Sequence, residues 1–410
     1  MRVLMFGWEY PPYAAGGLAT ATLALAGGLA RLGHEVTLVV PFPTDADGAV
    51  EGVHVINADA VAPNLTRVRL ASPLEPYASP RPAAAPWSGR SAERTAYRPT
   101  LFDDVASFAA AAAEIASLYP HDVIATHDWM AYGAGQAAHA VSGKPFVAHV
   151  HATEFDRSGA WPNADIAERE ASGLLAASRI IANSHATKRR IVEQYGAADH
   201  LVDVVHWGID APAENDTRAI SPFGSRVPVV LFVGRVVFQK GPDYFVEAAA
   251  RVAAIRDDVC FVIAGTGDML PAMLERCADR GIAHRVFFTG GISRKDAERL
   301  YRMATVCVMP SVSEPFGIVA LESLRAGTPV IVSKTSGVAE AVANLLTVDF
   351  WDIDDIADKI LAVVGDAALR NELGERTAEE LTDQRLGPDE PARLTLASYG
   401  RAISAEQREA

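Results

Sequence analysis

The chain has few cysteines and fewer basic than acidic residues. Each shortage excludes some classes of site or partner. Its three cysteines are Cys260, Cys277 and Cys307. Neither their number nor their spacing indicates a zinc site or a disulfide framework, so we expect buried thiols. The 37 lysines and arginines face 51 acidic residues, a net charge of -14. This charge argues against nucleic acid or an anionic membrane as the main partner. Any anionic substrate must therefore be held by local cations.

Long hydrophobic runs are also absent from the sequence. No segment approaches the roughly 20 apolar residues of a membrane-spanning helix. The N-terminus leads directly into a short apolar strand, without the pattern of a signal peptide. We therefore expect a cytoplasmic protein with no membrane span. The 410 residues, of which 50% are hydrophobic, are enough for two domains with separate cores.

Short apolar strands alternate with helical segments in both halves of the chain. This alternation is typical of doubly wound parallel sheets, so the fold class expected is α/β with two Rossmann-like domains. The strands expected are Val3–Phe6, Val36–Val40, Val123–Ala125, Pro145–Val150, Arg179–Ala182, Val202–Val205, Val229–Val233, Cys260–Ala264, Val286–Thr289 and Thr305–Met309.

Changes in composition suggest the domain boundaries. A first domain over 1–211 contains a proline-rich insertion at 62–100, which is either a functional lid or a mobile loop. Residues 212–226 have the Pro, Asn, Asp, Ser and Gly content of an interdomain linker. A second domain covers 227–385, and a helical segment over 386–410 closes the chain.

The stretch from 308 to 333 reads as strand, loop, helix and strand. Glu314 lies on the loop, Gly317 precedes the helix, and Glu322 lies about one turn into it. The helix start, at Ile318 and Val319, is an electropositive end suited to an anion. Two glutamates at this spacing are usually a solvated helix face. A phosphate beside two carboxylates that bind hydroxyls is nevertheless what a nucleotide-sugar site requires.

Two further loops contain glycine at the end of a strand. Gly234 ends an apolar strand and is followed by Arg235 and Lys240, two cations that suit a diphosphate. Near the N-terminus, Gly16 and Gly17 precede a helix in a β-α-β unit. Because this loop lacks the full G-x-G-x-x-G pattern, ordinary dinucleotide binding is disfavoured.

Polar side chains also follow two successive strands of the first half. The first group is His127, Asp128 and Trp129, and the second contains His149, His151, Glu154 and Asp156. A lone histidine after a strand is usually a structural hydrogen-bond partner. Two such groups at the ligand-binding edge of an α/β sheet favour a site. A metal site is disfavoured because the alternation of a strand places some of these residues on opposite faces.

Taken together, these motifs resemble the GT-B glycosyltransferases, and within them the retaining family 4 enzymes and their glycogen and starch synthase relatives. The resemblance covers nearly the whole chain. It implies an N-terminal acceptor-side domain and a C-terminal nucleotide-sugar domain that face each other across a deep cleft. It also implies that the last helix, with Tyr399 or its neighbours, crosses back to the first domain.

The resemblance assigns roles to individual residues. It implies that the catalytic residues are His151, Arg235, Lys240 and Glu314. The donor-binding residues implied are Gly16, Gly17, Gly234, Gly265, Gly290, Phe316, Gly317, Ile318, Val319 and Glu322. The acceptor-side residues implied are Glu9, His127, Asp128 and Trp129.

The resemblance also implies the chemistry. Glu314 would bind the 3- and 4-hydroxyls of the sugar, Glu322 the ribose, and His151 the 6-hydroxyl. Cationic side chains would stabilise the leaving phosphate without a metal ion. The tripeptides Asp45-Ala-Asp47 and Asp352-Ile-Asp354 look like the metal motif of the other glycosyltransferase architecture, but neither lies in the right context.

The function predicted is a retaining, metal-independent hexosyltransferase. It would move a hexose, with glucose expected, from an ADP-, UDP- or GDP-sugar to a sugar or glucan hydroxyl. The nucleotide sugar is a substrate, and no cofactor is expected. Glycogen synthases have a lysine where this chain has Ala14 and Ala15. A UDP- or GDP-sugar transferase acting on a small-molecule or lipid-linked acceptor therefore stays open.

Two hypotheses of another class are a non-catalytic nucleotide-sugar-binding regulatory protein and a GT-B epimerase. The presence of both Lys240 and Glu314 disfavours the regulatory protein. Incubation with the donor alone would reveal an epimerase. Assembly into a homo-oligomer also stays open.

Overall fold

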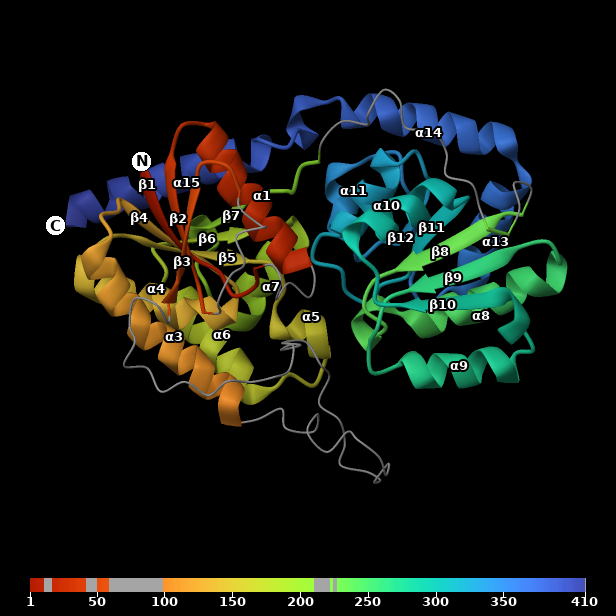
Figure 1. Ribbon diagram of the computed structural model, residues 1–410, viewed down its shortest axis with the longest axis horizontal. Coiled ribbons are helices and arrows are strands. Elements are labelled where there is room, and N and C mark those ends of the chain that lie inside the picture. Colours follow the sequence, from red (N-terminus) through yellow and green to blue (C-terminus); the bar gives the residue numbers. More distant parts are fainter. Residues whose placement is uncertain (11–16, 42–49, 59–98, 210–221, 224–226, 410) are drawn as a thin grey trace. The chain divides into compact units, whose positions relative to one another are not determined.

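The computed structural model describes residues 1–10, 17–41, 50–58, 99–209, 222–223 and 227–409 (Figure 1). Nearly all of the proline-rich insertion and of the expected linker lies outside these residues. The chain forms two compact units. Unit 1 comprises Met1–Val205 with Asp389–Ala410, and unit 2 comprises His206–Pro388. No helix among the described residues is both long and apolar enough to cross a membrane.

Unit 1 is built on a seven-stranded parallel sheet in the order β3-β2-β1-β4-β5-β6-β7. Its strands are β1 (Arg2–Phe6), β2 (Glu35–Val40), β3 (Val53–Asn57), β4 (Val123–His127), β5 (Phe146–Val150), β6 (Arg179–Ala182) and β7 (Val202–Val204). The strand order reverses between β1 and β4. Ligands of open α/β sheets bind outside the carboxyl ends of the strands at such a point.

Helices cover both faces of this sheet, with α3 and α4 on one side and α1 and α15 on the other (Figure 1). The helices of unit 1 are α1 (Gly17–Arg31), α3 (Pro99–Leu118), α4 (Trp129–Ser142), α5 (Glu154–Ser158), α6 (Ala164–Ala176), α7 (His185–Tyr195) and α15 (Glu390–Glu409), with a 3-10 turn η2 (Asp199–Leu201). The core lies between the sheet and α3 and α4, where Phe108 makes edge contacts with Phe6 and Trp8.

Strand β3 was not among the expected strands. It lies at the edge of the sheet, and most of its residues are partly or fully exposed. It therefore lacks the continuous apolar run that marks a central parallel strand.

Unit 2 contains a six-stranded parallel sheet in the order β10-β9-β8-β11-β12-β13. The strands are β8 (Val229–Val233), β9 (Cys260–Ala264), β10 (Val286–Gly290), β11 (Val306–Met309), β12 (Val330–Ser333) and β13 (Leu346–Val348). The order reverses between β8 and β11. The two parallel-sheet α/β units confirm the predicted fold class.

Helices of unit 2 also lie on both sides, with α8 and α9 on one face and α10 and α11 on the other (Figure 1). They are α8 (Pro242–Ile255), α9 (Leu270–Asp279), α10 (Arg294–Met303), α11 (Ile318–Arg325), α12 (Val338–Ala341), α13 (Ile353–Gly365) and α14 (Ala367–Leu381), with 3-10 turns η3 (Phe238–Lys240), η4 (Ala283–Arg285) and η5 (Gln384–Leu386).

The three cysteines are free thiols of unit 2. Cys277 and Cys307 are buried, as predicted, whereas Cys260 is partly exposed. Burial raises the pKa of Cys277 to about 11 and that of Cys307 to about 12. Because the thiolate is the reactive form, these two residues are packing groups.

Candidate active site

In unit 2, the loops after β8 and β11 bring Lys240 and Glu314 together. The Lys240 Nζ donates to both Glu314 carboxylate oxygens, at 2.8 and 2.6 Å. Ser311 Oγ donates to Oε2 of the same carboxylate at 3.1 Å. Because β8 and β11 flank the reversal of strand order, this pair lies at the topological switch point of the sheet.

Backbone hydrogen bonds hold the loop that carries Glu314. The amide of Val312 donates to the carbonyl of Gln239 at 3.0 Å, which joins this loop to the one after β8. The carbonyl of Glu314 accepts from Gly337 at 2.9 Å, which joins it to the loop after β12. Glu314 is therefore anchored through its main chain as well as its side chain.

The glycines at the ends of β8, β9 and β10 lie side by side. The amide of Gly265 donates to the carbonyl of Gly290 at 2.9 Å, and Gly265 has a φ of 144°. A Cβ on Gly265 would lie 1.9 Å from the carbonyl oxygen of Gly234. Two backbones can approach this closely only without a side chain between them. The structure thus brings together three of the glycines predicted to bind the donor.

Helix α11 begins at Ile318, directly after the loop that carries Glu314, and its N-cap residue is Gly317, whose φ is 109°. Ile318 and Val319 form its first turn, where backbone N–H groups favour an anion. Phe316, just before the helix, is buried and stacks on His206, with ring centroids 5.9 Å apart.

Glu322 lies one turn further along α11. Its Oε2 accepts a hydrogen bond from the hydroxyl of Tyr301 at 3.0 Å. Burial raises the pKa of Glu322, while the bond from Tyr301 acts in the opposite direction. The guanidinium of Arg235 donates to the side-chain oxygen of Gln239 at 3.0 Å, within the loop after β8.

In unit 1, three histidines gather at the carboxyl ends of β4 and β5. His127 Nδ1 and His151 Nε2 are 2.8 Å apart and share a hydrogen bond. The ring of His127 also stacks on that of His149, with centroids 4.6 Å apart. His149 Nε2 lies 2.8 Å from the hydroxyl of Tyr399 on α15, 250 residues further along the chain. The three rings and Tyr399 form one connected group, which we call the histidine cluster.

Burial keeps the histidine cluster neutral. It lowers the pKa of His127 well below its usual value, and the neighbouring histidines lower it further. Burial, together with the repulsion that a protonated His151 would exert, lowers the pKa of His149 to about 3. Burial also lowers the pKa of His151, against an opposing effect of Asp128. Near pH 7 these rings are therefore uncharged imidazoles, each with one donor and one acceptor nitrogen.

Asp128 has a strained backbone beside the cluster. Its φ is 61° and its ψ is 172°, and it is the only described residue other than glycine with a positive φ. Such a conformation costs about 1–3 kcal/mol and persists where its surroundings fix it. Here the amide of Asp128 donates to the carbonyl of His149 at 3.0 Å, and its carboxylate accepts from the amide of His151 at 2.7 Å. The residue with the strained backbone thus forms a direct hydrogen bond to the backbone of His151.

The other acceptor-side residues have structural partners. Glu9 is buried and accepts from the amide of Ala19 at 3.3 Å, in the first turn of α1. Gly17 is the first residue of that helix, whereas Gly16 lies outside the described residues. Trp129 is buried in the core of unit 1, where its ring contacts Phe102.

The carboxylates considered as metal ligands also have structural partners. Glu154 accepts from Arg157 at 3.0 Å, and Asp156 forms a capping box with Thr153. Asp352 caps α13 by accepting from the amide of Asp355 at 3.0 Å. The tripeptide 45–47 lies outside the described residues.

Sequence reasoning did not single out three of these partners. Gln239 and Ser311 support Arg235 and Glu314, and Tyr301 supports Glu322. Gln239 lies between the two predicted cations in the sequence, and this position was the signal that could have identified it as a partner. Tyr301 lies 21 residues before its partner, without a local pattern.

Two parallel α/β units with polar residues at both switch points fit the GT-B class of glycosyltransferases. Residues 15–212 match the family model described as Glycosyltransferase Family 4, and residues 213–380 match that described as Glycosyl transferases group 1. The chain belongs to family 4 of the glycosyltransferases, as the sequence motifs predicted.

Similar proteins span nearly the same length. A D-inositol 3-phosphate glycosyltransferase of Mycobacterium sp. (strain KMS) is 30% identical over 411 residues, covering 95% of this chain and 86% of the relative. A glycogen synthase of Mycobacterium tuberculosis (strain H37Rv) is 27% identical over 402 residues, covering 93% and 90%. The structure of sucrose-phosphate synthase from Thermosynechococcus elongatus has a TM-score of 0.76 at 21% identity, covers 98% of this chain and 99% of its own, and supports the fold.

Proposed function

We propose that this glycosyltransferase moves a hexose from a nucleoside-diphosphate sugar to a hydroxyl of a sugar or glucan, with retention of configuration and without a metal ion. The observation that carries the proposal is the contact between Lys240 and Glu314. In a nucleotide sugar the hexose is attached to the outer phosphate. A cation and a hydroxyl-binding carboxylate must therefore lie within a few ångströms of each other, as these two do.

The charges of unit 2 suit the leaving group. Cleavage of the sugar–phosphate bond places negative charge on the diphosphate. We assign stabilisation of this charge to Lys240, Arg235 and the N-terminal turn of α11, all of which present positive charge or N–H donors. The acceptor oxygen bonds to the anomeric carbon on the face from which the diphosphate departs, and the acceptor's proton passes to the leaving phosphate oxygen. Attack from this face preserves the anomeric configuration and needs no protein nucleophile.

Carboxylates of unit 2 would bind the hydroxyls of the donor. Glu314 would accept from the 3- and 4-hydroxyls of the hexose, in place of its bonds to Lys240. Glu322 would accept from the ribose hydroxyls through Oε1, because Oε2 is bonded to Tyr301.

In unit 1, we assign His151 to the 6-hydroxyl of the hexose and His127 to fixing its tautomer. The other ring nitrogen of His127, Nε2, is buried and has no hydrogen-bond partner among the described residues. Orphaned buried N–H groups are rarer than orphaned acceptors, so we place the His127 proton on Nδ1. His127 then donates to His151 Nε2, and His151 presents Nδ1–H as a donor.

The relatives support two kinds of acceptor. The relative named glycogen synthase supports a glucan, and the relative named for D-inositol 3-phosphate supports a small phosphorylated acceptor. The alanines at 14 and 15, where glycogen synthases have a lysine, favour the small acceptor with a UDP- or GDP-sugar.

A panel of ADP-, UDP- and GDP-hexoses tests the proposal, with release of nucleoside diphosphate measured with and without each acceptor. We expect one donor to dominate, release to require an acceptor, and the product to have the anomeric configuration of the donor by NMR. Activity should persist in excess chelator. An isomerised donor formed without an acceptor would instead show an epimerase, and binding without turnover would show a regulatory protein. Loss of activity on chelation and its return with magnesium or manganese would contradict metal independence.

A further inference from the structure

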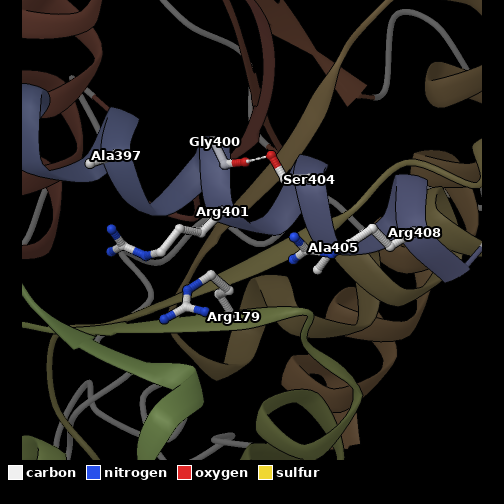
Figure 2. Close-up of a pocket in the computed structure, with 7 residues that line it drawn as sticks. All are labelled: Arg179, Ala397, Gly400, Arg401, Ser404, Ala405 and Arg408. Carbon is white, nitrogen blue, oxygen red and sulfur yellow. Dashed lines mark hydrogen bonds between the residues drawn. The ribbon is translucent and has the colours of Figure 1, made fainter.

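Unit 1 has a polar pocket between α15 and the start of β6 (Figure 2). Its volume is about 480 Å³. The pocket is lined by Arg179, Ala397, Gly400, Arg401, Ser404, Ala405 and Arg408. We call it the arginine pocket. Figure 2 shows Arg401 and Arg408 extending from α15, with Arg179 below them on the strand.

The spacing of residues along α15 creates the hollow. Positions 397, 401, 404 and 408 are three or four residues apart, so they lie on one face of the helix. Small residues separate the two arginines on this face, and a Cβ on Gly400 would meet no atom within 4 Å. The hydroxyl of Ser404 donates to the carbonyl of Gly400 at 2.8 Å, so the donors left to a ligand are mainly guanidinium groups.

The pocket has an excess of positive charge. Asp203 accepts from both Arg179, at 2.8 and 2.9 Å, and Arg401, at 2.9 Å. Burial would raise the pKa of Asp203, but these bonds and one from Ser398 lower it to about 2, so it stays ionised. The single negative charge of Asp203 is therefore shared by two arginines. Arg408 makes no ion pair with any side chain that the structure describes, and no lining residue is acidic.

The arginine pocket is separate from the histidine cluster. Arg179 is the first residue of β6, whereas the histidines lie at the carboxyl ends of β4 and β5. The four residues of β6 place these ends of the sheet roughly 10 Å apart. A ligand of the arginine pocket would therefore not occupy the site assigned to the hexose.

We propose that the arginine pocket binds a small phosphorylated molecule through its phosphate group. Guanidinium groups match the geometry of phosphate and are the side chains most often used to recognise it. The volume lies within the range of about 300–1,000 Å³ of small-molecule sites, so it also holds the group to which the phosphate is attached. The ion pairs with Asp203 anchor α15, and this structural role accounts for the presence of Arg179 and Arg401. It does not account for the presence of Arg408 or for the empty volume of the arginine pocket.

Calorimetric titration with inorganic phosphate tests this proposal, with chloride at matched ionic strength as the reference. Arg408→Gln should weaken phosphate binding about tenfold, the worth of one charge-assisted hydrogen bond. Arg401→Gln should weaken it similarly. The matched control is Arg393→Gln, which removes an exposed arginine of the same helix that does not line the pocket. It should change the affinity less than twofold.

The Lys240→Ala variant distinguishes phosphate binding in the arginine pocket from phosphate binding at the donor site of unit 2. Binding that survives Lys240→Ala but not Arg408→Gln belongs to the arginine pocket, whether or not the protein transfers sugar. Unchanged binding in Arg408→Gln and Arg401→Gln, or an equal loss in Arg393→Gln, would overturn the proposal. A protein that sediments with vesicles of phosphatidic acid in phosphatidylcholine but does not bind free phosphate would bind a lipid headgroup through these arginines. This result would overturn the proposal of a small-molecule ligand.

Discussion

The two units place their candidate site residues at the same edge of the same kind of sheet, but they hold them by different means. In unit 2, charged side chains lie on loops that need glycine, as the close approach of Gly265 to Gly234 shows. In unit 1, neutral histidines lie at strand ends, buried and bonded to one another. The first arrangement suits an anion because its cations stay charged. The second suits a hydroxyl, because a buried neutral imidazole offers a donor of fixed position without attracting phosphate.

Removal of the cation should have the largest effect. We expect Lys240→Ala to lower turnover by roughly 10²- to 10³-fold, the usual loss of one preorganised charge-stabilising group. The affinity for the free nucleoside should change little, because the lysine acts on charge that develops at the phosphate. Steady-state kinetics and nucleoside titration measure the two effects. Lys334→Ala is the control, because Lys334 is an exposed lysine of the same unit, paired with Asp349. Near-normal turnover of Lys240→Ala would remove this residue from the site.

The variant of His151, the histidine that we assign to the 6-hydroxyl of the hexose, should come next. We expect His151→Ala to lower transfer by about 10²-fold while the affinity for nucleoside diphosphate stays within a few-fold, since the groups assigned to the diphosphate belong to unit 2. Melting temperature and turnover per folded molecule should be measured on one preparation. His121 is the control, because it is buried in the same unit and bonded to Tyr119 and Ser142. His121→Ala should lower only the melting temperature, and the same behaviour in His151→Ala would show a structural histidine.

The dependence of unit 2 on glycine predicts an effect on stability. Gly265→Ala should lower the free energy of unfolding by about 2 kcal/mol or more, because it combines a strained φ with a backbone clash. The control is Gly281→Ala, where φ is 71° but no atom lies within 4 Å of the added Cβ. That change should cost only about 1 kcal/mol. Urea denaturation measures both values, and equal losses would mean that the close approach is unimportant.

The tautomer assignment predicts a smaller and reversible effect. His127→Ala should lower turnover about tenfold, the value of one hydrogen bond that orients His151. His127→Asn should recover most of this loss, because its amide nitrogen donates from nearly the position of Nδ1. Equal losses in the two variants, per folded molecule, would show that the ring of His127 acts only by packing.

The neutral histidines predict a modest pH dependence. The folded pKa of His149 lies below its unfolded value of about 6.5, so the unfolded state binds more protons between them. The stability is therefore complete above pH 6.5 and is lost as the pH falls toward 3. The slope for this residue is at most about 1.4 kcal/mol per pH unit. Urea denaturation at pH 7 and pH 5.5 should show this loss. His149→Gln should reduce it, and an unchanged slope in that variant would contradict the assignment to His149.

The sequence determined most of the local structure. Apolar runs, and glycines or prolines that follow them, located β8, β9 and β11 within one residue of their observed ends. The same patterns placed Lys240 and Glu314 after neighbouring strands, because residues after parallel strands share one edge of the sheet. The edge strands β3 and β13 and helix α6 were missed, since their short or weakly apolar segments give little periodic signal.

Contacts between distant segments were decided only by the tertiary structure. The sequence suggested that Tyr399 or a neighbour returns to the first domain, but not that its hydroxyl meets His149. It placed two histidines after neighbouring strands, but did not predict the hydrogen bond between their rings. It gave no sign that Arg179 and Arg401 share Asp203. Strand and helix patterns follow from interactions over a few residues, whereas these partners are brought together by the order of strands and the packing of α15 on the sheet.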